Sequence, residues 1–279
     1  MKPTSTLSNP ASRSDEEPRD DRIAGRWRLL ISHPLSGVEN MALDEALLWR
    51  ARASGEAVIR VYTWSEPTLS LGRNQAARGL YDEPRAKRRG IAIVRRPTGG
   101  RALLHHREIT YSVTTPTRTL SLKAAYGRIN RILVDALQRL GLPVVLAGAQ
   151  PSGRLPDASP CFVAPSEGEI VLGGGKLVGS AQWREGDALL QHGSILIDDD
   201  QPMIAELMTA PAPPVPPPAT LRQALATVPS PEAVAYALAE AIQAIDGLEC
   251  EPLRDEPSLA ARTAELTAKY SDRSWTWRR

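Results

Sequence analysis

The pattern of apolar and polar residues predicts helices in three parts of the chain. Residues 40–55 begin with Asn40, a good N-cap residue, and stop at Gly55, so they predict a helix. A second helix is predicted over residues 122–140, where apolar side chains recur every three or four residues before Gly141. After residue 220 we expect the chain to be helical, with one helix opened by Pro231.

Between these helices, alternating and β-branched apolar residues predict strands. The predicted strands are residues 57–64, 68–73, 91–96, 108–115, 143–148, 169–172, 176–183 and 188–197. The alternation in one of them places Ile109, Tyr111 and Val113 on a single face. Because the strands cluster and do not alternate regularly with helices, we expect an α+β fold with a mixed, largely antiparallel sheet flanked by helices.

Composition divides the chain into four parts. Residues 1–22 are polar and predict a disordered N-terminal segment, whereas residues 23–210 carry the strand patterns and predict one folded domain. Residues 211–220 contain six prolines within eight positions, so we expect a stiff connector there; a ligand for a partner domain is the alternative. Residues 221–279 then form a helical C-terminal segment, either a small accessory domain or a cover on the sheet.

Charge and cysteine content exclude several classes of protein. The 34 Lys and Arg residues against 32 Asp and Glu residues leave a net charge of +2, which argues against a nucleic-acid or acidic-membrane surface. Two cysteines provide neither a disulfide framework nor a structural zinc site, and the chain shows neither a secretory signal nor a long apolar span. We therefore expect a cytoplasmic, soluble protein without a metal.

Three polar, glycine-bearing segments interrupt the strands, and each has a simpler structural interpretation beside the functional one. The tandem glycines of "RRPTGGRALLHH" (95–106) would let the backbone approach a ligand, but they also fit a plain hairpin turn. Lys176 in "GGGKLVGSAQ" (173–182) fits a solvated strand residue, and Gly173 and Gly174 fit a hairpin turn. His192 in "LLQHGSILI" (189–197) fits a hydrogen-bonded core histidine, although Gly193 indicates a close approach to the backbone.

The two cysteines have different surroundings. Cys161 lies in a Pro- and Ser-bounded loop, where it could pack as a small apolar group or react as a thiolate. Cys250 stands between Glu249 and Glu251, and neighbouring carboxylates disfavour a thiolate. If either cysteine reacts, we expect it to be Cys161.

Six motifs together resemble one family. In chain order they are "NMALDEAL" (40–47), "PTLSLGRNQ" (67–75), "RRPTGGRALLHHREITYSV" (95–113), "CF" (161–162), "KLVGSAQ" (176–182) and "LLQHGSILI" (189–197). The set resembles the lipoate-protein ligase and octanoyltransferase superfamily, which shares a fold with biotin protein ligases. The resemblance runs from about residue 27 to residue 200, and "AKYSDRSWTWRR" near the end of the chain is similar to the family's C-terminal signature.

The resemblance is strongest to the octanoyl-[acyl-carrier-protein]:protein octanoyltransferases of the ligase-like branch. It implies that Cys161 is the nucleophile and that Lys176, fifteen residues later, lowers the pKa of the cysteine. It also implies a set of residues that bind the acyl group and substrate. These are Arg96, Thr98, Gly99, Gly100, Arg101, His105, Gly179, Ser180, Gln182, His192 and Gly193. His106 departs from the family, where an acidic residue is expected after the histidine.

The chemistry of a free thiol agrees with what the resemblance implies. A cysteine with a pKa of about 8.5 is mostly protonated at neutral pH, and a nearby ammonium group lowers that pKa. Exchange between thioesters needs no nucleotide, so no cofactor is expected. The implied donor is octanoyl-acyl carrier protein, and the implied acceptors are lipoyl-domain proteins such as glycine cleavage H protein or 2-oxoacid dehydrogenase E2 subunits.

Three other functions stay open from the sequence. An ATP-dependent lipoate-protein ligase would need no cysteine, whereas an octanoyl amidotransferase between lipoyl-domain proteins would use one. A lipoyl-domain-binding or regulatory protein with a degenerate site is the alternative outside the enzymes.

Overall fold

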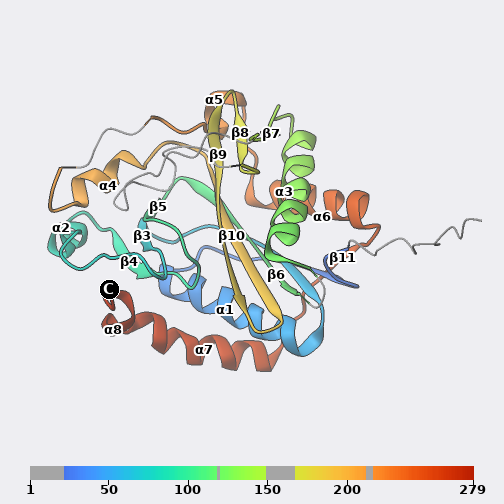
Figure 1. The fold of residues 1–279 in the computed structure, drawn as a ribbon, viewed down its shortest axis with the longest axis horizontal. Helices are drawn as coiled ribbons and strands as arrows, with labels where there is room; N and C mark the ends of the chain where they lie inside the picture. Colours follow the sequence, from blue (N-terminus) through green and yellow to red (C-terminus); the bar gives the residue numbers. More distant parts are fainter. Residues whose placement is uncertain (1–21, 118–119, 149–166, 212–215) are drawn as a thin grey trace, which may run out of the picture.

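The computed structural model describes residues 22–117, 120–148, 167–211 and 216–279, which build two sheets flanked by helices (Figure 1). The eight-stranded main sheet has the order β11 (Cys250–Pro252), β1 (Trp27–Ile31), β2 (Ala57–Tyr62), β6 (Glu108–Pro116), β10 (Ala188–Leu196), β9 (Gly175–Glu185), β8 (Ile170–Leu172) and β7 (Val145–Leu146). The three-stranded sheet has the order β4 (Ala92–Arg95), β3 (Thr68–Leu71) and β5 (Leu103–His105). The helices are α1 (Gly37–Ser54), α2 (Glu83–Arg88), α3 (Leu122–Arg139), α4 (Pro202–Leu207), α5 (Leu221–Ala224), α6 (Pro231–Asp246), α7 (Pro257–Ser271) and α8 (Arg273–Thr276).

The strand directions confirm the predicted mixed, largely antiparallel sheet. Strand β1 runs parallel to both β2 and β11, and the other neighbours in the main sheet are antiparallel. Strand β11 lies in the segment after residue 220, which was predicted to be helical throughout. Its three residues pair with β1 at the edge of the main sheet, so the C-terminal segment contributes to this sheet as well as covering it.

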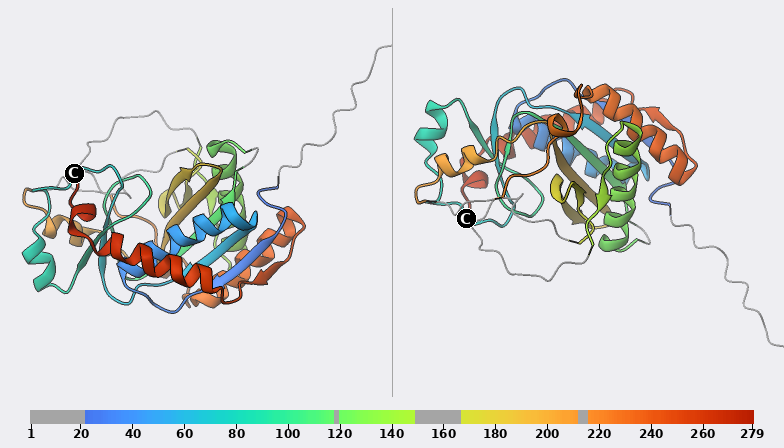
Figure 2. Two further views of the ribbon diagram at one scale, coloured as in Figure 1. Left: turned by 90° about the horizontal axis from the view of Figure 1, so that it is seen from below. Right: turned by 90° about the horizontal axis from the view of Figure 1, so that it is seen from above.

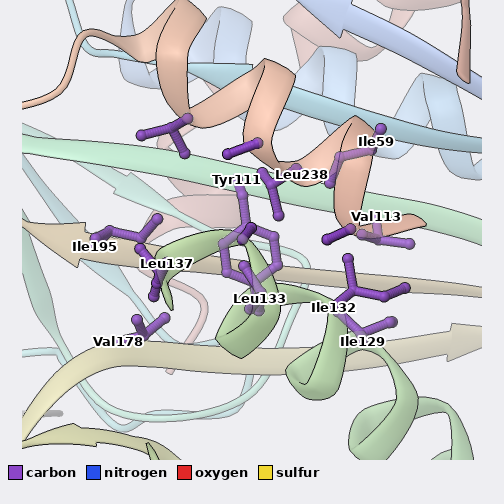
Figure 3. Packing of buried hydrophobic residues seen from close by; sticks show 14 of the residues in the cluster. Ile59, Tyr111, Val113, Ile129, Ile132, Leu133, Leu137, Val178, Ile195 and Leu238 are labelled. Atoms are coloured by element: carbon purple, nitrogen blue, oxygen red, sulfur yellow. The ribbon is translucent and has the colours of Figure 1, made fainter. Parts of the chain in front are cut away.

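One face of the main sheet packs against α3 and α6 (Figure 2). Ile109, Tyr111 and Val113 point to this face, as the alternation predicted, and they belong to the largest apolar core together with Leu133 of α3 and Leu238 of α6 (Figure 3). Each fully buried aliphatic side chain contributes about 1.5–3 kcal/mol through the hydrophobic effect. The apolar stripe predicted for residues 122–140 is therefore what attaches α3 to the sheet.

Helix α1 covers the opposite face of the main sheet, and it begins earlier than predicted. Its N-cap is Ser36, whose hydroxyl accepts a hydrogen bond from the Glu39 amide while the Glu39 carboxylate accepts one from the Ser36 amide. Asn40, predicted as the cap, is instead buried in the first turns, where its amide donates to the carbonyl of Leu35. The predicted end is confirmed, because Gly55 caps the helix with a φ of 72°.

Helix α7 lies along α1 and brings the end of the chain back to the small sheet (Figure 2). Lys269 and Tyr270 of α7 both bond the buried carboxylate of Glu45 on α1, and Trp275 donates from its indole nitrogen to the carbonyl of Arg95 at the end of β4. None of the helices described here is long and apolar enough to span a membrane.

Two glycine-bearing connections have different geometries. Gly173 and Gly174 both have positive φ and join β8 to β9, which confirms the hairpin turn considered for them. The segment 96–102 connects β4 to β5, and these strands lie on opposite sides of β3. The plain-hairpin interpretation of that segment is therefore wrong.

Candidate active site

The face of the main sheet under α1 is polar although it is buried. Side chains alternate along a strand, so the residues between the core-facing ones of β2, β6 and β10 all point toward α1. The buried polar residues among them are Arg60, Tyr62, Glu108, Thr110, Ser112, Thr114, His192 and Ser194. A strand in which every second residue is polar usually exposes that face to solvent, but here α1 covers the polar face.

Asp44 of α1 is the centre of this polar layer. Its carboxylate accepts hydrogen bonds from Arg60 Nη1 at 2.7 Å, Tyr62 Oη at 2.9 Å, Ser112 Oγ at 2.8 Å and His192 Nδ1 at 2.9 Å. Burial alone would raise the pKa of Asp44, but the Arg60 charge and the bond from His192 outweigh it and hold the pKa below its usual value. Asp44 can therefore be fully buried as a carboxylate, because four side-chain donors bond its oxygens.

His192 links this layer to the loop that follows β4. Its Nδ1 donates to Asp44, so the neutral ring accepts at Nε2 from the Thr98 hydroxyl, 2.7 Å away. Burial lowers the pKa of His192 in spite of the neighbouring carboxylate, which favours the neutral form. The residue is a hydrogen-bonded core histidine, as one interpretation of the sequence had it, and one edge of its ring also borders a cavity.

His105 occupies a second polar cluster beside the first. Its Nδ1 lies 2.7 Å from Glu108 Oε1, its Nε2 lies 2.8 Å from Ser70 Oγ, and its ring stacks on Trp64 with centroids 3.9 Å apart. The ring is therefore held in one orientation by hydrogen bonds at both ring nitrogens and by one aromatic face.

The two clusters border a narrow cavity with a free volume of about 20 Å³, which is room for about one water molecule. Its lining residues are Met41, Tyr62, Trp64, Arg96, Leu103, His105, Thr110, Gly179, Ser180, Ala181, His192, Gly193 and Ser194. Ser180 and Ala181 are half-exposed, whereas Tyr62 and Ser194 are completely buried, so the cavity opens beside β9 and ends under α1. The exposed part of this lining is mostly carbon.

The cavity brings together six of the residues that the sequence analysis singled out. They are Arg96, His105, Gly179, Ser180, His192 and Gly193. A Cβ on Gly193 would lie 2.7 Å from both the Gly179 carbonyl oxygen and a ring carbon of Tyr111, so only glycine fits there. Gln182 lies further along β9 and donates to the side chain of Gln191.

The remaining residues of the 96–101 loop shape its backbone and lie outside the cavity lining. The Arg96 guanidinium donates to the carbonyls of Ser70, Gly99 and Arg101, which closes the loop on itself. Gly100 has a φ of 93°, and its carbonyl oxygen would lie 1.9 Å from a Cβ on Gly72.

The two loop glycines should respond differently to substitution. Valine at Gly100 must adopt a left-handed conformation and meets the Arg96 guanidinium at 2.7 Å, whereas a Cβ on Gly99 meets nothing within 4 Å. We expect Gly100→Val to lower the free energy of unfolding by at least about 2 kcal/mol, while Gly99→Val changes it by about 0.5 kcal/mol or less. Denaturant unfolding of the two variants checks this, and an equal loss in both would contradict the difference.

Lys176 is buried at the start of β9, with 4% of its surface exposed, so the solvated interpretation is wrong. Its ammonium group lies 2.8 Å from Glu169 Oε1, and it is not part of the cavity lining.

Cys161 lies outside the described residues. Cys250 is unsuited to nucleophilic chemistry because burial, and then the charge of Asp246, raises the pKa of its thiol to about 12; this cause differs from the expected effect of Glu249 and Glu251.

Arg101 and His106 flank the cavity-lining residues in sequence but do not line the cavity themselves. Arg101 is half-buried, and His106 is exposed with its Nδ1 at 3.3 Å from Asp200 Oδ2. Within the described ranges, no group of three or more His, Cys, Asp or Glu side chains is arranged to hold a metal ion.

Residues 36–243 match the family described as the lipoyl protein ligase A/B catalytic domain. The chain belongs to this family. It is 37% identical over 272 residues to octanoyltransferase LipM of Kyrpidia tusciae, a match that spans 91% of this chain and 99% of that protein. It is 43% identical over 179 residues to octanoyltransferase LipM of Carboxydothermus hydrogenoformans, across 62% of this chain and 66% of that protein. Because these relatives are octanoyltransferases, the chain is an acyltransferase.

The solved structures agree on the fold. Lipoate-protein ligase A bound with ATP superimposes with a TM-score of 0.76 at 22% identity, covering 90% of this chain and 98% of that one. Protein Ta0514 of T. acidophilum, solved with bound lipoic acid, gives a TM-score of 0.74 at 22% identity, covering 91% of this chain and 99% of that one. The expected ligase-type fold is thereby confirmed.

Sequence reasoning missed several residues of the site. Asp44 stands within the quoted motif "NMALDEAL", four residues after Asn40 and so on the same helix face, a spacing that could have indicated a shared polar contact. Arg60 interrupts the apolar strand "AVIRVY", which was a second available signal. The carboxyl of Glu108 and the ring of Trp64 gave no local sign of their role beside His105.

Proposed function

We propose that the chain transfers an octanoyl group from octanoyl-acyl carrier protein to a lysine of lipoyl domains, through a thioester on Cys161. The observation that carries this is the narrow, mostly carbon-lined cavity that opens beside β9 and ends under buried residues. The apolar lining suits an acyl chain, because removing each CH₂ from water contributes about 0.8 kcal/mol. The side chains around the cavity must move apart to admit the chain, since the free volume is only about 20 Å³. The relatives named octanoyltransferase LipM support the choice of acyl group.

The first step exchanges one thioester for another. The Cys161 thiolate attacks the carbonyl carbon of the donor thioester, the carbon–sulfur bond to the carrier breaks, and the carrier thiolate leaves and takes up a proton. We assign Lys176 to this step as the cation that stabilises the thiolate. Its burial strengthens that effect, because a charge in a poorly solvated place interacts more strongly with its neighbours. The Glu169 carboxylate, 2.8 Å away, offsets part of the ammonium charge.

The second step forms an amide. The unprotonated amine of the acceptor lysine attacks the acyl-enzyme carbonyl, the bond to the Cys161 sulfur breaks, and the amine loses its proton. An amide is more stable than a thioester, so this step makes the overall transfer favourable without a nucleotide. Acceptors of the expected kind are lipoyl-domain proteins such as glycine cleavage H protein or 2-oxoacid dehydrogenase E2 subunits.

The test compares two donors with one purified acceptor, a lipoyl domain. We expect wild-type protein to octanoylate the domain from octanoyl-acyl carrier protein without ATP, as followed by intact mass. Free octanoate with Mg-ATP should give at least about 100-fold less product. A faster reaction from octanoate and ATP would overturn the proposal in favour of an ATP-dependent ligase.

A further inference from the structure

Five arginines gather where the loop 72–78 meets the last residues of the chain, and we name this group the arginine seam. Its members are Arg73, Arg78, Arg95, Arg278 and Arg279. They join two segments some 200 residues apart, mainly by donating to main-chain carbonyls. The guanidinium of Arg95 donates to the carbonyls of Thr276 and Gln75 at 2.8 Å each, and Arg278 donates to that of Arg73 at 3.2 Å.

The described part of the chain places no acidic side chain against the seam. Over the described residues, no Asp or Glu oxygen pairs within 4.0 Å with a guanidinium of the seam. Two guanidinium groups of the seam instead stack on tryptophan rings. Arg73 lies 4.6 Å from the ring centroid of Trp183, and Arg278 lies 4.3 Å from that of Trp275. Burial and then the charge of Arg278 lower the pKa of Arg95 to about 10.

Such an arrangement is complementary to negative charge from outside. The chain as a whole carries only +2, so the seam is a local concentration and not a consequence of an overall basic protein. Arg78 and Arg279 are exposed and Arg73 and Arg278 are half-buried, so the charge is presented to solvent. Clusters of one sign raise the rate of association with an oppositely charged partner by about 10- to 1,000-fold.

The seam adjoins the mouth of the cavity without forming part of it. The amide of Arg73 donates to the Thr98 carbonyl at 2.7 Å, which connects the seam to the 96–101 loop. Trp183, on which Arg73 stacks, follows Ala181 of the mouth by two residues on β9, so both side chains point to the same side about 7 Å apart along the strand. The seam therefore borders the mouth from one side.

We infer that the arginine seam docks the acidic surface of the carrier protein that delivers the acyl group; this rests on the proposed function. An acceptor lysine is a short side chain, so its protein must sit directly on the mouth. A carrier protein presents its acyl group on a long flexible arm, so its body contacts the enzyme beside the mouth. The position of the seam fits the second case, and a contact dominated by surface charge suits a complex that must separate after each transfer.

The experiment measures octanoyl transfer to a lipoyl domain by Arg78→Gln/Arg279→Gln and by wild type, with two donors. With octanoyl-acyl carrier protein at about 0.05 M salt, we expect kcat/KM to fall about tenfold, mainly through KM. The difference should vanish near 1 M salt, where charges are screened beyond about 3 Å. With octanoyl-pantetheine, which has no protein and no phosphate, the rate should not change.

The matched control is Arg88→Gln/Arg131→Gln, which removes two exposed arginines from α2 and α3 and so changes the net charge equally. It should keep the wild-type kcat/KM with both donors. Wild-type kinetics in Arg78→Gln/Arg279→Gln, an equal loss with both donors, or a raised KM for the lipoyl domain alone would each overturn the inference. Failure of the proposed function would look different, because wild type itself would then transfer from neither thioester.

Discussion

Replacing Cys161 by alanine should abolish octanoyl transfer, with a loss of at least about 1,000-fold in kcat/KM. The physical reason is that Cys250, the other cysteine of the chain, cannot replace it: burial and Asp246 raise the pKa of its thiol to about 12, so it stays protonated at neutral pH. The measurement is intact mass after incubation with octanoyl-acyl carrier protein but no acceptor. Wild type should gain one octanoyl group.

Cys250→Ala is the matched control for this prediction, since it removes the other cysteine of the chain. It should retain both the octanoyl adduct and the transfer rate, because Cys250 lies in β11 at the far edge of the main sheet from β9. An octanoyl adduct on Cys161→Ala at the wild-type rate would rule out the thioester assignment. Loss of the adduct in Cys250→Ala alone would reverse the roles of the two cysteines.

Asp44→Ala should lower the free energy of unfolding by about 3–5 kcal/mol. Arg60 and Asp44 are both fully buried and paired at 2.7 Å, so removing the carboxylate leaves an unbalanced guanidinium in the interior. The control is Asp135→Ala, which breaks an exposed pair with Arg139 on α3 and should change the free energy by about 1 kcal/mol or less. Urea unfolding followed by circular dichroism gives both values.

A second substitution separates the unbalanced charge from simple loss of packing. Asp44→Ala/Arg60→Met removes the guanidinium as well, and we expect it to be more stable than Asp44→Ala alone. A double variant no more stable than the single one would contradict this explanation.

The pKa of Asp44 is lowered in the folded state, so its contribution to stability is present above the unfolded pKa of about 3.9 and is lost as pH falls through the folded pKa. Asp44→Ala should therefore lose less stability than wild type on acidification.

Local sequence determined much of the fold, because helix ends and strand faces depend on neighbouring residues. The apolar stripe of α3 and the glycine cap at Gly55 follow from such short-range rules, and both are found in the structure. The start of α1 was misplaced because Asn40 is a good cap by itself, whereas the reciprocal bonds of Ser36 and Glu39 satisfy two amides at once.

The family motifs were also readable in the sequence, but the polar layer under α1 was not. Alternation shows that Arg60, Ser112 and His192 face one side of their strands. Only the position of α1 decides that this side is buried and that Asp44 bonds all three. The arginine seam depends in the same way on contacts between residues far apart in the chain, such as Arg95 with Thr276. Periodicity fixes the direction of a side chain relative to its own strand or helix, whereas its partners depend on how distant segments pack.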